Sequence, residues 1–301
     1  MATVEVRRYD DTSAPTIDGQ NGSLITALDA ILVNGYGSES ALGWTKSYSG
    51  TNKAVYRGDT TNGTGFYIRI DDGNATTTRA EIRGYETMTG VDTGSNAFPT
   101  TDTMYITKSN SADSTARPWM VYGDDYGVWL LIYIGSTSTG GSSDRAAVYF
   151  FGDFVTKDPD DSYNCVVSGH SDGSTYPYFF SDRYITDAPY TSGDLTYVAR
   201  KADGTGSGGD NSIKLIGGAD FRIAAASLNS KLMWSSFGGL DDCAARTYRG
   251  FLPAVHICLH DYTYMTDDSS HGDFQYHNVG YSSTLIDGIL FDVTKDFRVH
   301  I

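Results

Sequence analysis

The sequence predicts a mainly β protein with an antiparallel, sandwich-type architecture, one short helix near the N-terminus and an extended N-terminal arm. Two observations predict this class. The 301 residues include 34 Gly, 22 Tyr and 13 Phe, the turn formers and aromatic strand formers that many short antiparallel strands require. From residue 43 onward, apolar residues recur mainly with a period of two, and Gly, Asn and Asp interrupt them.

A single helix is expected after the first turn-rich residues. Ser23 is suited to cap its start, and Leu24, Leu28 and Leu32 then fall on one helical face. Gly35 is suited to end it, because glycine tolerates the left-handed conformation that closes many helices. The pattern therefore predicts an amphipathic helix over about three turns.

Short strands fill the region that follows. The segment 128–134 is apolar on both faces and is expected to lie centrally, whereas Asp-Asp pairs with neighbouring glycine predict tight hairpin turns at 71–74 and 123–126. Seven strands are predicted at 53–57, 65–70, 78–85, 103–108, 119–123, 127–134 and 146–151. Four more are predicted at 163–168, 195–201, 212–216 and 255–259.

The chain divides into three regions on this pattern. Residues 1–40 hold the arm and the helix, since the pieces at 10–15 and 18–23 are polar and bury little. Residues 41–157 form a β-sandwich-like domain, and residues 158–301 form a second β-rich region that is either separate from the first or continuous with it.

Charge and composition exclude several classes of protein. The 22 Lys and Arg against 37 Asp and Glu give a net charge of -15, the wrong sign for a nucleic-acid partner. The longest apolar run, 128–134, is too short for membrane insertion, and no apolar segment follows the first charges as in a secretory or transit signal. Three cysteines, Cys165, Cys243 and Cys258, predict no disulfide framework and favour a reduced cytosolic origin.

Two glycine motifs lack the context that would make them functional. Gly169, Ser171 and Gly173 match the nucleophile elbow of hydrolases, but a proline and aromatic residues stand where the following helix should begin. The run 204–209 matches a dinucleotide-binding loop, yet the next segment, 212–216, predicts a strand instead of a phosphate-binding helix. We therefore expect no catalytic residue and no cofactor.

Histidine and cysteine gather near the C-terminus. His256, Cys258 and His260 alternate along one predicted strand, and His271 and His277 follow. Imidazole and thiolate are good ligands for zinc or iron. The spacing matches no metal motif, so we expect the protein to bind no metal. The alternative is a metal site with His256, Cys258 and His260 as its ligands.

Acidic pairs and tryptophans have two interpretations each. The preferred interpretation of the acidic clusters is that they form turns, and the alternative is that they supply carboxylate pairs for glycoside hydrolysis. The clusters lie at 71–72, 124–125, 158–161, 241–242 and 267–268. Aromatic residues at this density more often fill cores and interfaces than bind sugars. Trp44 and Trp119 are nevertheless the candidates for ligand contact.

Ten short segments, none of them a catalytic signature, together span most of the chain. They lie at 13–15, 22–25, 32–37, 43–46, 54–57, 69–72, 83–88, 91–94, 151–154 and 249–253. In this order they resemble segments of a family of tailed-bacteriophage virion proteins. The resemblance implies a structural component of the virion, in the tail or baseplate, and supplies no active-site residues.

The leading hypothesis is therefore a noncatalytic tail or baseplate subunit that is assembled in the bacterial cytoplasm and located in the virion. Its expected partners are other virion structural proteins and further copies of itself. The residues expected to attach it, by arm position and helix face, are Arg7, Arg8, Pro15, Leu24, Leu28 and Leu32. The competing hypotheses are a receptor-recognition protein that binds a host surface glycan or pilus, and a polysaccharide depolymerase.

Overall fold

The structure, a computed structural model, confirms a mainly β protein whose strand pairs are antiparallel. It describes residues 4–73, 76–100, 103–135, 146–170, 195–204, 212–216, 234–236, 239–242, 247–253, 255–258, 269–271, 274–278 and 288–292. Within these ranges the only helical segment is α1 (Ser23–Leu28), continued by the π-helical turn η1 (Asp29–Asn34). No helix in the part of the chain that the structure describes is long and apolar enough to cross a membrane.

Most strands belong to one large sheet. Its main path runs β11-β17-β16-β14-β13-β12-β7-β5-β4-β3-β2; β6 pairs with β5, and β12 also pairs with β10, which leads to β9, β8 and β1. The bounds are β1 (Glu5–Arg8), β2 (Thr45–Gly50), β3 (Lys53–Arg57), β4 (Tyr67–Asp71), β5 (Arg79–Gly90), β6 (Thr93–Phe98), β7 (Met104–Thr107), β8 (Trp119–Gly123), β9 (Gly127–Tyr133), β10 (Ala146–Asp153), β11 (Val155–Thr156), β12 (Cys165–His170), β13 (Leu195–Ala199), β14 (Ser212–Ile216), β16 (Gly239–Asp242) and β17 (Thr247–Phe251).

A second sheet comes from the last part of the chain. Its order is β15-β18-β21-β20-β19, with bounds β15 (Trp234–Ser236), β18 (Val255–Cys258), β19 (Ser269–His271), β20 (Phe274–Asn278) and β21 (Gly288–Asp292). The large sheet takes strands from both β-rich regions that the sequence distinguishes, because β12, β13, β14, β16 and β17 continue it beyond residue 158. The second region is thus continuous with the first through this sheet.

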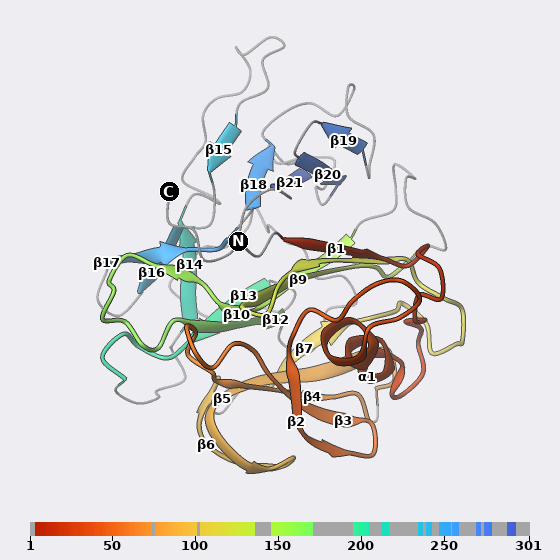
Figure 1. Cartoon of the computed structure of the whole chain (residues 1–301), viewed down its shortest axis with the longest axis horizontal. Helices are drawn as coiled ribbons and strands as arrows, with labels where there is room; N and C mark the ends of the chain where they lie inside the picture. The colour runs from red at the N-terminus through yellow and green to blue at the C-terminus, as the bar shows by residue number, and fades with distance from the viewer. Residues whose placement is uncertain are drawn as a thin grey trace.

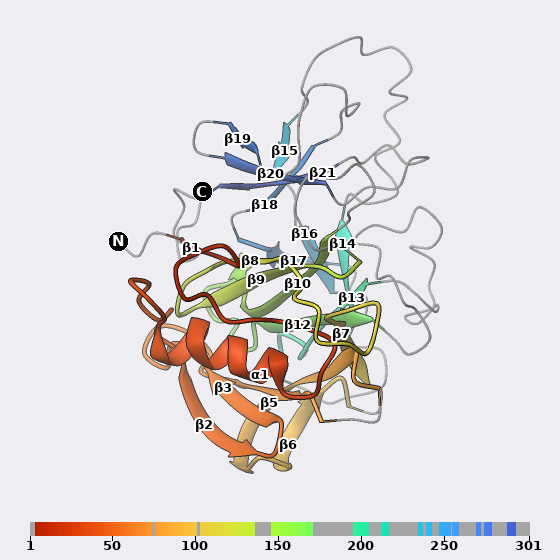
Figure 2. The same ribbon diagram turned by 90° about the vertical axis from the view of Figure 1, so that its right-hand side faces the viewer.

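The large sheet curls so that two of its parts face each other across a core. In Figures 1 and 2, β2 to β5 form one layer, β9, β10 and β12 form the other, and α1 lies at the side of the space between them. Alternate residues of both layers point into one apolar cluster, for example Ile68 and Ile70 from β4 and Leu130 and Ile132 from β9. The period-two pattern of the sequence reflects this packing.

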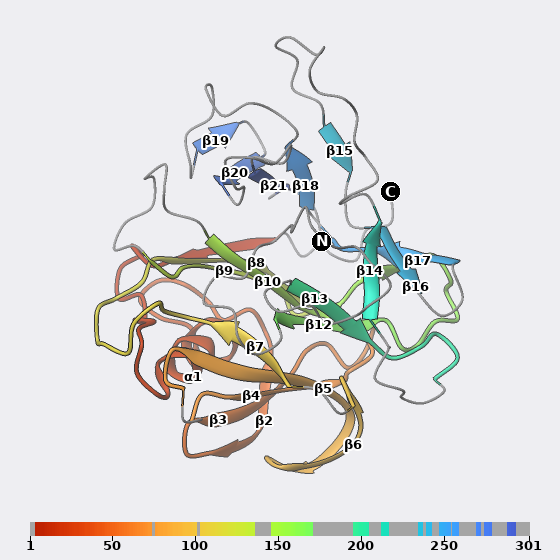
Figure 3. The same cartoon turned by 180° about the vertical axis from the view of Figure 1, so that it is seen from behind.

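Strand β9 is central, as its two apolar faces predict. It pairs with β8 on one side and β10 on the other, and every residue from Gly127 to Tyr133 is buried. The face of β9 that points away from the apolar cluster between the two layers is also covered. On that face Trp129 packs on Phe150 and donates its indole N–H to the carbonyl of Pro253 at 2.9 Å. Figure 3 shows β9 and β10 between the layer of β2 to β5 and the C-terminal strands.

The helix begins and ends as predicted, although its start is capped by a different residue. Ser23 is its first residue, after Gly22 with φ 86°, and the N–H of Leu24 donates to Oδ2 of Asp72 at 2.9 Å. Gly35 follows the last helical turn with φ 77°. A buried carboxylate from the end of β4 therefore supplies the cap that the sequence assigned to Ser23.

The N-terminal segment is extended, but it is built into the domain and does not project as an arm. Strand β1 pairs with β8 over four residues, and Ile17 is fully buried and forms a bridge with Arg117. The indole N–H of Trp119 donates to the carbonyl of Pro15 at 2.9 Å. The burial of Ile17 could not be predicted from the sequence, because a single apolar residue among polar ones gives no periodic pattern.

Candidate interaction face

The residues that the sequence assigned to attachment are largely used inside the chain. Leu24, Leu28 and Leu32 have no exposed surface and belong to the central core, so the helix face expected to bind a partner instead packs on the sheet. Arg7 is buried and donates to the carbonyl of Ser40. A partner has no access to these four side chains in this fold, and that part of the prediction is corrected.

Arg8 and Pro15 keep partial exposure. Arg8 pairs with Asp10, with Nε 2.9 Å from Oδ1 of the carboxylate, and Pro15 uses its carbonyl to accept from Trp119. Their role in attachment stays a prediction.

The two candidate ligand-binding tryptophans are core residues. Trp119 is fully buried, and Trp44 is 4% exposed. Trp44 donates its indole N–H to the carbonyl of Asp124 at 2.7 Å and packs edge-on against Phe151. Because both indole N–H groups are bonded and both rings are covered, the expected ligand contact is corrected as well.

The histidine and cysteine candidates lie only partly within the described residues. His256 and Cys258 are on β18, opposite Ser236 and Trp234 of β15, whereas His260 lies outside the described residues. His271 ends β19 and His277 is on β20. Within the described ranges no group of three His, Cys, Asp or Glu side chains could hold a metal ion.

The glycine motifs and the acidic pair at 124–125 have structural roles where they are described. Residues 169 and 170 end β12, while 171–173 lie outside the described residues. The segment after the glycine-rich run is strand β14, as expected, and it pairs with β13. Asp124 accepts the N–H groups of Tyr126 and Gly127 within the β8–β9 turn.

A small cavity contains one buried carboxylate that no cation within the described residues neutralises. Trp44, Phe66, Tyr126 and Asp153 are among its lining residues. Asp153 accepts the N–H of Thr64 at 2.6 Å and its hydroxyl at 2.7 Å, and burial raises the pKa of this carboxyl to about 6. The shift makes folding stability depend on pH.

We predict that Asp153→Asn removes this dependence. The folded state binds the Asp153 proton more tightly than the unfolded chain, so the contribution of the carboxyl is greatest below its ordinary pKa of 3.8 and is lost as the pH rises to about 6. The free energy of unfolding of the native chain, relative to the variant, should fall by about 2 kcal/mol between pH 4 and pH 7. Urea denaturation of both chains measures it, and a difference independent of pH would refute the assignment.

The outer face of β3, β4 and β5 carries a cluster of arginine and tyrosine. The register places Arg57, Tyr67 and Tyr85 in one cross-strand row, and Arg69 and Arg83 in the next. All five side chains are partly exposed. We call Arg57, Tyr67, Arg83 and Tyr85 the Arg–Tyr face.

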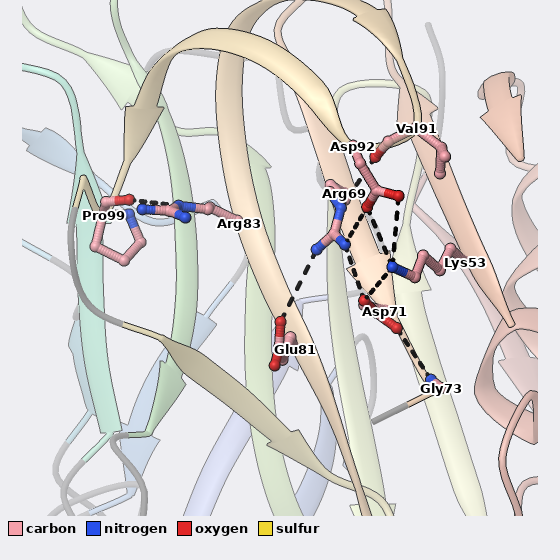
Figure 4. Close-up of polar contacts among 9 residues, drawn as sticks. All are labelled: Lys53, Arg69, Asp71, Gly73, Glu81, Arg83, Val91, Asp92 and Pro99. Atoms are coloured by element: carbon pink, nitrogen blue, oxygen red, sulfur yellow. Dashed lines mark hydrogen bonds and ion pairs between the residues drawn. The ribbon is translucent and has the colours of Figure 1, made fainter. Parts of the chain in front are cut away.

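A charged network holds one side of this face. Arg69 lies between Asp71 and Asp92, with Nη2 at 2.8 Å and 2.6 Å from their carboxylates, and Lys53 contacts the same two acids (Figure 4). Hydrogen bonding from Arg69 lowers the pKa of Asp92, and hydrogen bonding to Asp71 raises the pKa of Lys53. Both acids are therefore already neutralised by Arg69 and Lys53.

The two arginines of the Arg–Tyr face are held differently. Arg57 Nε donates to the carbonyl of Gly65 at 2.6 Å, and Arg83 donates to the carbonyls of Pro99, at 2.7 Å, and Thr100. Their guanidinium carbons lie 4.7 Å and 6.0 Å from the ring centroids of Tyr67 and Tyr85. Among the residues placed by the structure, neither arginine has a carboxylate partner.

This arrangement suits the binding of an anionic partner. Carbonyl bonds and stacking on tyrosine fix the guanidinium planes without neutralising them, and each guanidinium has five N–H donors. Arginine and tyrosine are enriched at protein interfaces, where they dominate binding energy. The face is therefore preorganised for carboxylates or other anions.

Sequence reasoning missed this face because it requires the register of three strands. The available signal was the alternation in Tyr67-Ile68-Arg69-Ile70, which places polar aromatic and cationic side chains on the outer face. Comparison of the chain with protein-family models and with curated proteins finds no match. The function is therefore inferred from the chain's own residues.

Proposed function

We propose that the protein is a noncatalytic structural subunit of a tailed-bacteriophage particle, in the tail or baseplate, and that it acts by assembly with other virion proteins. The observation that carries this proposal is the Arg–Tyr face, a rigid and partly exposed surface of the residue types that dominate protein interfaces. The resemblance of short segments to virion proteins supports the kind of particle.

The fold is suited to such a role. The large sheet buries its apolar residues against itself and the helix, so its outer face can present polar side chains in fixed positions. Arg83 and Tyr85 sit on β5, a strand of 12 residues hydrogen-bonded to β4, β6 and β7. Side chains on a paired strand lose little further freedom on binding, which favours assembly.

We predict that Arg57→Gln/Arg83→Gln reduces incorporation into particles at least about tenfold, because both guanidinium charges are lost from the interface. The measurement is quantitative mass spectrometry of particles purified from the phage that encodes the chain, with native or variant protein supplied in the host. Lys46→Gln/Lys201→Gln, which removes the same charge at positions outside the face, should incorporate normally. Absence of the native chain from the particles would overturn the proposed function.

A second candidate function is recognition of a host surface glycan or pilus. The observation that favours it is the set of partly exposed tyrosines on the same face, since tyrosine rings stack on sugars. The same variants discriminate the two functions: a receptor-binding protein with the Arg57→Gln/Arg83→Gln change would still incorporate into particles but would no longer bind host cells.

A further inference from the structure

The Arg–Tyr face and its flanking network carry an excess of positive charge in an acidic protein. Five cations and three anions share the outer side of β3 to β5 with the turn that follows β5: Lys53, Arg57, Arg69, Arg79 and Arg83 against Asp71, Glu81 and Asp92. The whole chain has a net charge of -15, so the remainder is more acidic than the chain as a whole. A second copy of the chain therefore presents complementary charge to this face.

The sign of the charge decides how two copies meet. A two-fold contact of one Arg–Tyr face with another would place like charges together, which is repulsive. A heterologous contact, in which the face of one copy meets an acidic surface of the next, is attractive and repeats from copy to copy. Such a contact closes into a ring or continues as a stack.

An exposed acidic turn of the chain fits the face. Asp158, Pro159 and Asp160, between β11 and β12, are all exposed. The N–H of Asp160 donates to Oδ1 of Asp158 at 3.0 Å, which fixes the turn. The next residue, Asp161, is buried and accepts from Arg249 Nε at 2.7 Å.

The anchoring at Asp161 matters because it keeps the exposed carboxylates in place without neutralising them. Arg249 is bound to Asp161, and neither Asp158 nor Asp160 has an ion pair in the described part of the chain. Two ordered carboxylates and two ordered guanidinium groups can form charge-assisted hydrogen bonds with little loss of side-chain entropy.

We infer that the protein self-associates head to tail, with the Asp158–Asp160 turn of one copy bound to the Arg–Tyr face of the next. This inference rests on the proposed assembly function and names the partner as a second copy of the chain. The contact is electrostatic and partly exposed, so it weakens as salt increases.

The test is a charge exchange measured by sedimentation velocity on the purified full chain. The native chain should associate at low salt and dissociate at 0.5 M NaCl, where the screening length falls to about 4 Å. Arg57→Glu/Arg83→Glu and Asp158→Lys/Asp160→Lys should each be monomeric. An equimolar mixture of the two variants should associate again, because the acidic face of one then meets the basic turn of the other.

Controls separate the contact from folding and from net charge. Circular dichroism spectra and melting curves of both variants should match those of the native chain. Asp158→Asn/Asp160→Asn should lower the association constant at least about tenfold, whereas Ala112→Lys/Ala116→Lys, which changes the net charge equally at exposed positions, should leave it within about twofold.

Two results would overturn the inference. One is a native chain that stays monomeric at low salt and high concentration. The other is association that persists in Asp158→Asn/Asp160→Asn, which would place the contact elsewhere. If the monomeric native chain is still incorporated into particles and Arg57→Gln/Arg83→Gln is not, the proposed function stands and the partner is a different virion protein.

Discussion

Deletion of residues 1–22 is expected to leave a chain without a stable native fold. The deletion removes β1 from the edge of β8, uncovers the core at Ile17 and takes away the carbonyl that Trp119 binds. Loss of one buried isoleucine side chain alone costs about 2–5 kcal/mol, against a typical total stability of about 5–15 kcal/mol.

The measurement is urea denaturation followed by circular dichroism. Ile17→Ala tests one component and should lose about 2–5 kcal/mol. Ser13→Gly is the matched control in the same segment, because Ser13 has φ 65° and glycine adopts this conformation without strain. Suppose that the truncated chain unfolds cooperatively with a free energy of unfolding within about 1 kcal/mol of the native value. That result would contradict the assignment of this segment to the core.

The strands that the sequence predicts best are those buried on at least one face. The segment 119–123 is strand β8 with the same bounds, and the strand predicted at 127–134 is the central strand β9, which ends one residue earlier. Strands β2 and β6 were missed because their residues are small or polar and mostly exposed. Hydrogen bonds with β3 and β5 hold them in the sheet, and a hydrophobic pattern does not report such bonds.

The candidate face could be predicted only in part. Alternation along 67–70 indicates which residues point outward, but the row that joins Arg57, Tyr67 and Tyr85 spans 29 residues of chain and two hairpins. The charge of the face also depends on Arg69, because this residue binds the nearby acids and leaves Arg83 to bind carbonyls. Neither relation exists before the strands are paired.

A buried ion pair beneath the helix start is another feature that composition conceals. Asp72 follows Asp71 and precedes Gly73, so it resembles a turn residue. In the structure its side chain has no exposed surface and lies against Lys108, whose Nζ is 2.8 Å from Oδ1. Lys108 also donates to Ser23 Oγ at 3.0 Å and to the carbonyl of Gln20, so the pair joins β4, β7 and the helix start.

Lys108→Met is predicted to destabilise the protein by about 3–5 kcal/mol at pH 8, because it leaves the Asp72 carboxylate buried without its cation. Burial raises the pKa of Asp72 to about 6, and the nearby Lys108 ammonium opposes that rise. Removing Lys108 therefore raises the pKa of Asp72 further. Urea denaturation of the variant and the native chain at several pH values provides the measurement.

The pH dependence separates this mechanism from a simple loss of packing. In Lys108→Met the folded state binds the Asp72 proton more tightly than the unfolded chain does, so stability is present at low pH and is lost as the pH rises through the folded pKa. The deficit relative to the native chain should therefore shrink at pH 5. Asp72→Asn/Lys108→Met, which buries no charge at this position and keeps an amide oxygen near Leu24, should recover most of the loss at pH 8. An equal deficit at pH 5 and pH 8, unrelieved in the double variant, would mean that the methylenes of Lys108 and not its charge stabilise the helix start.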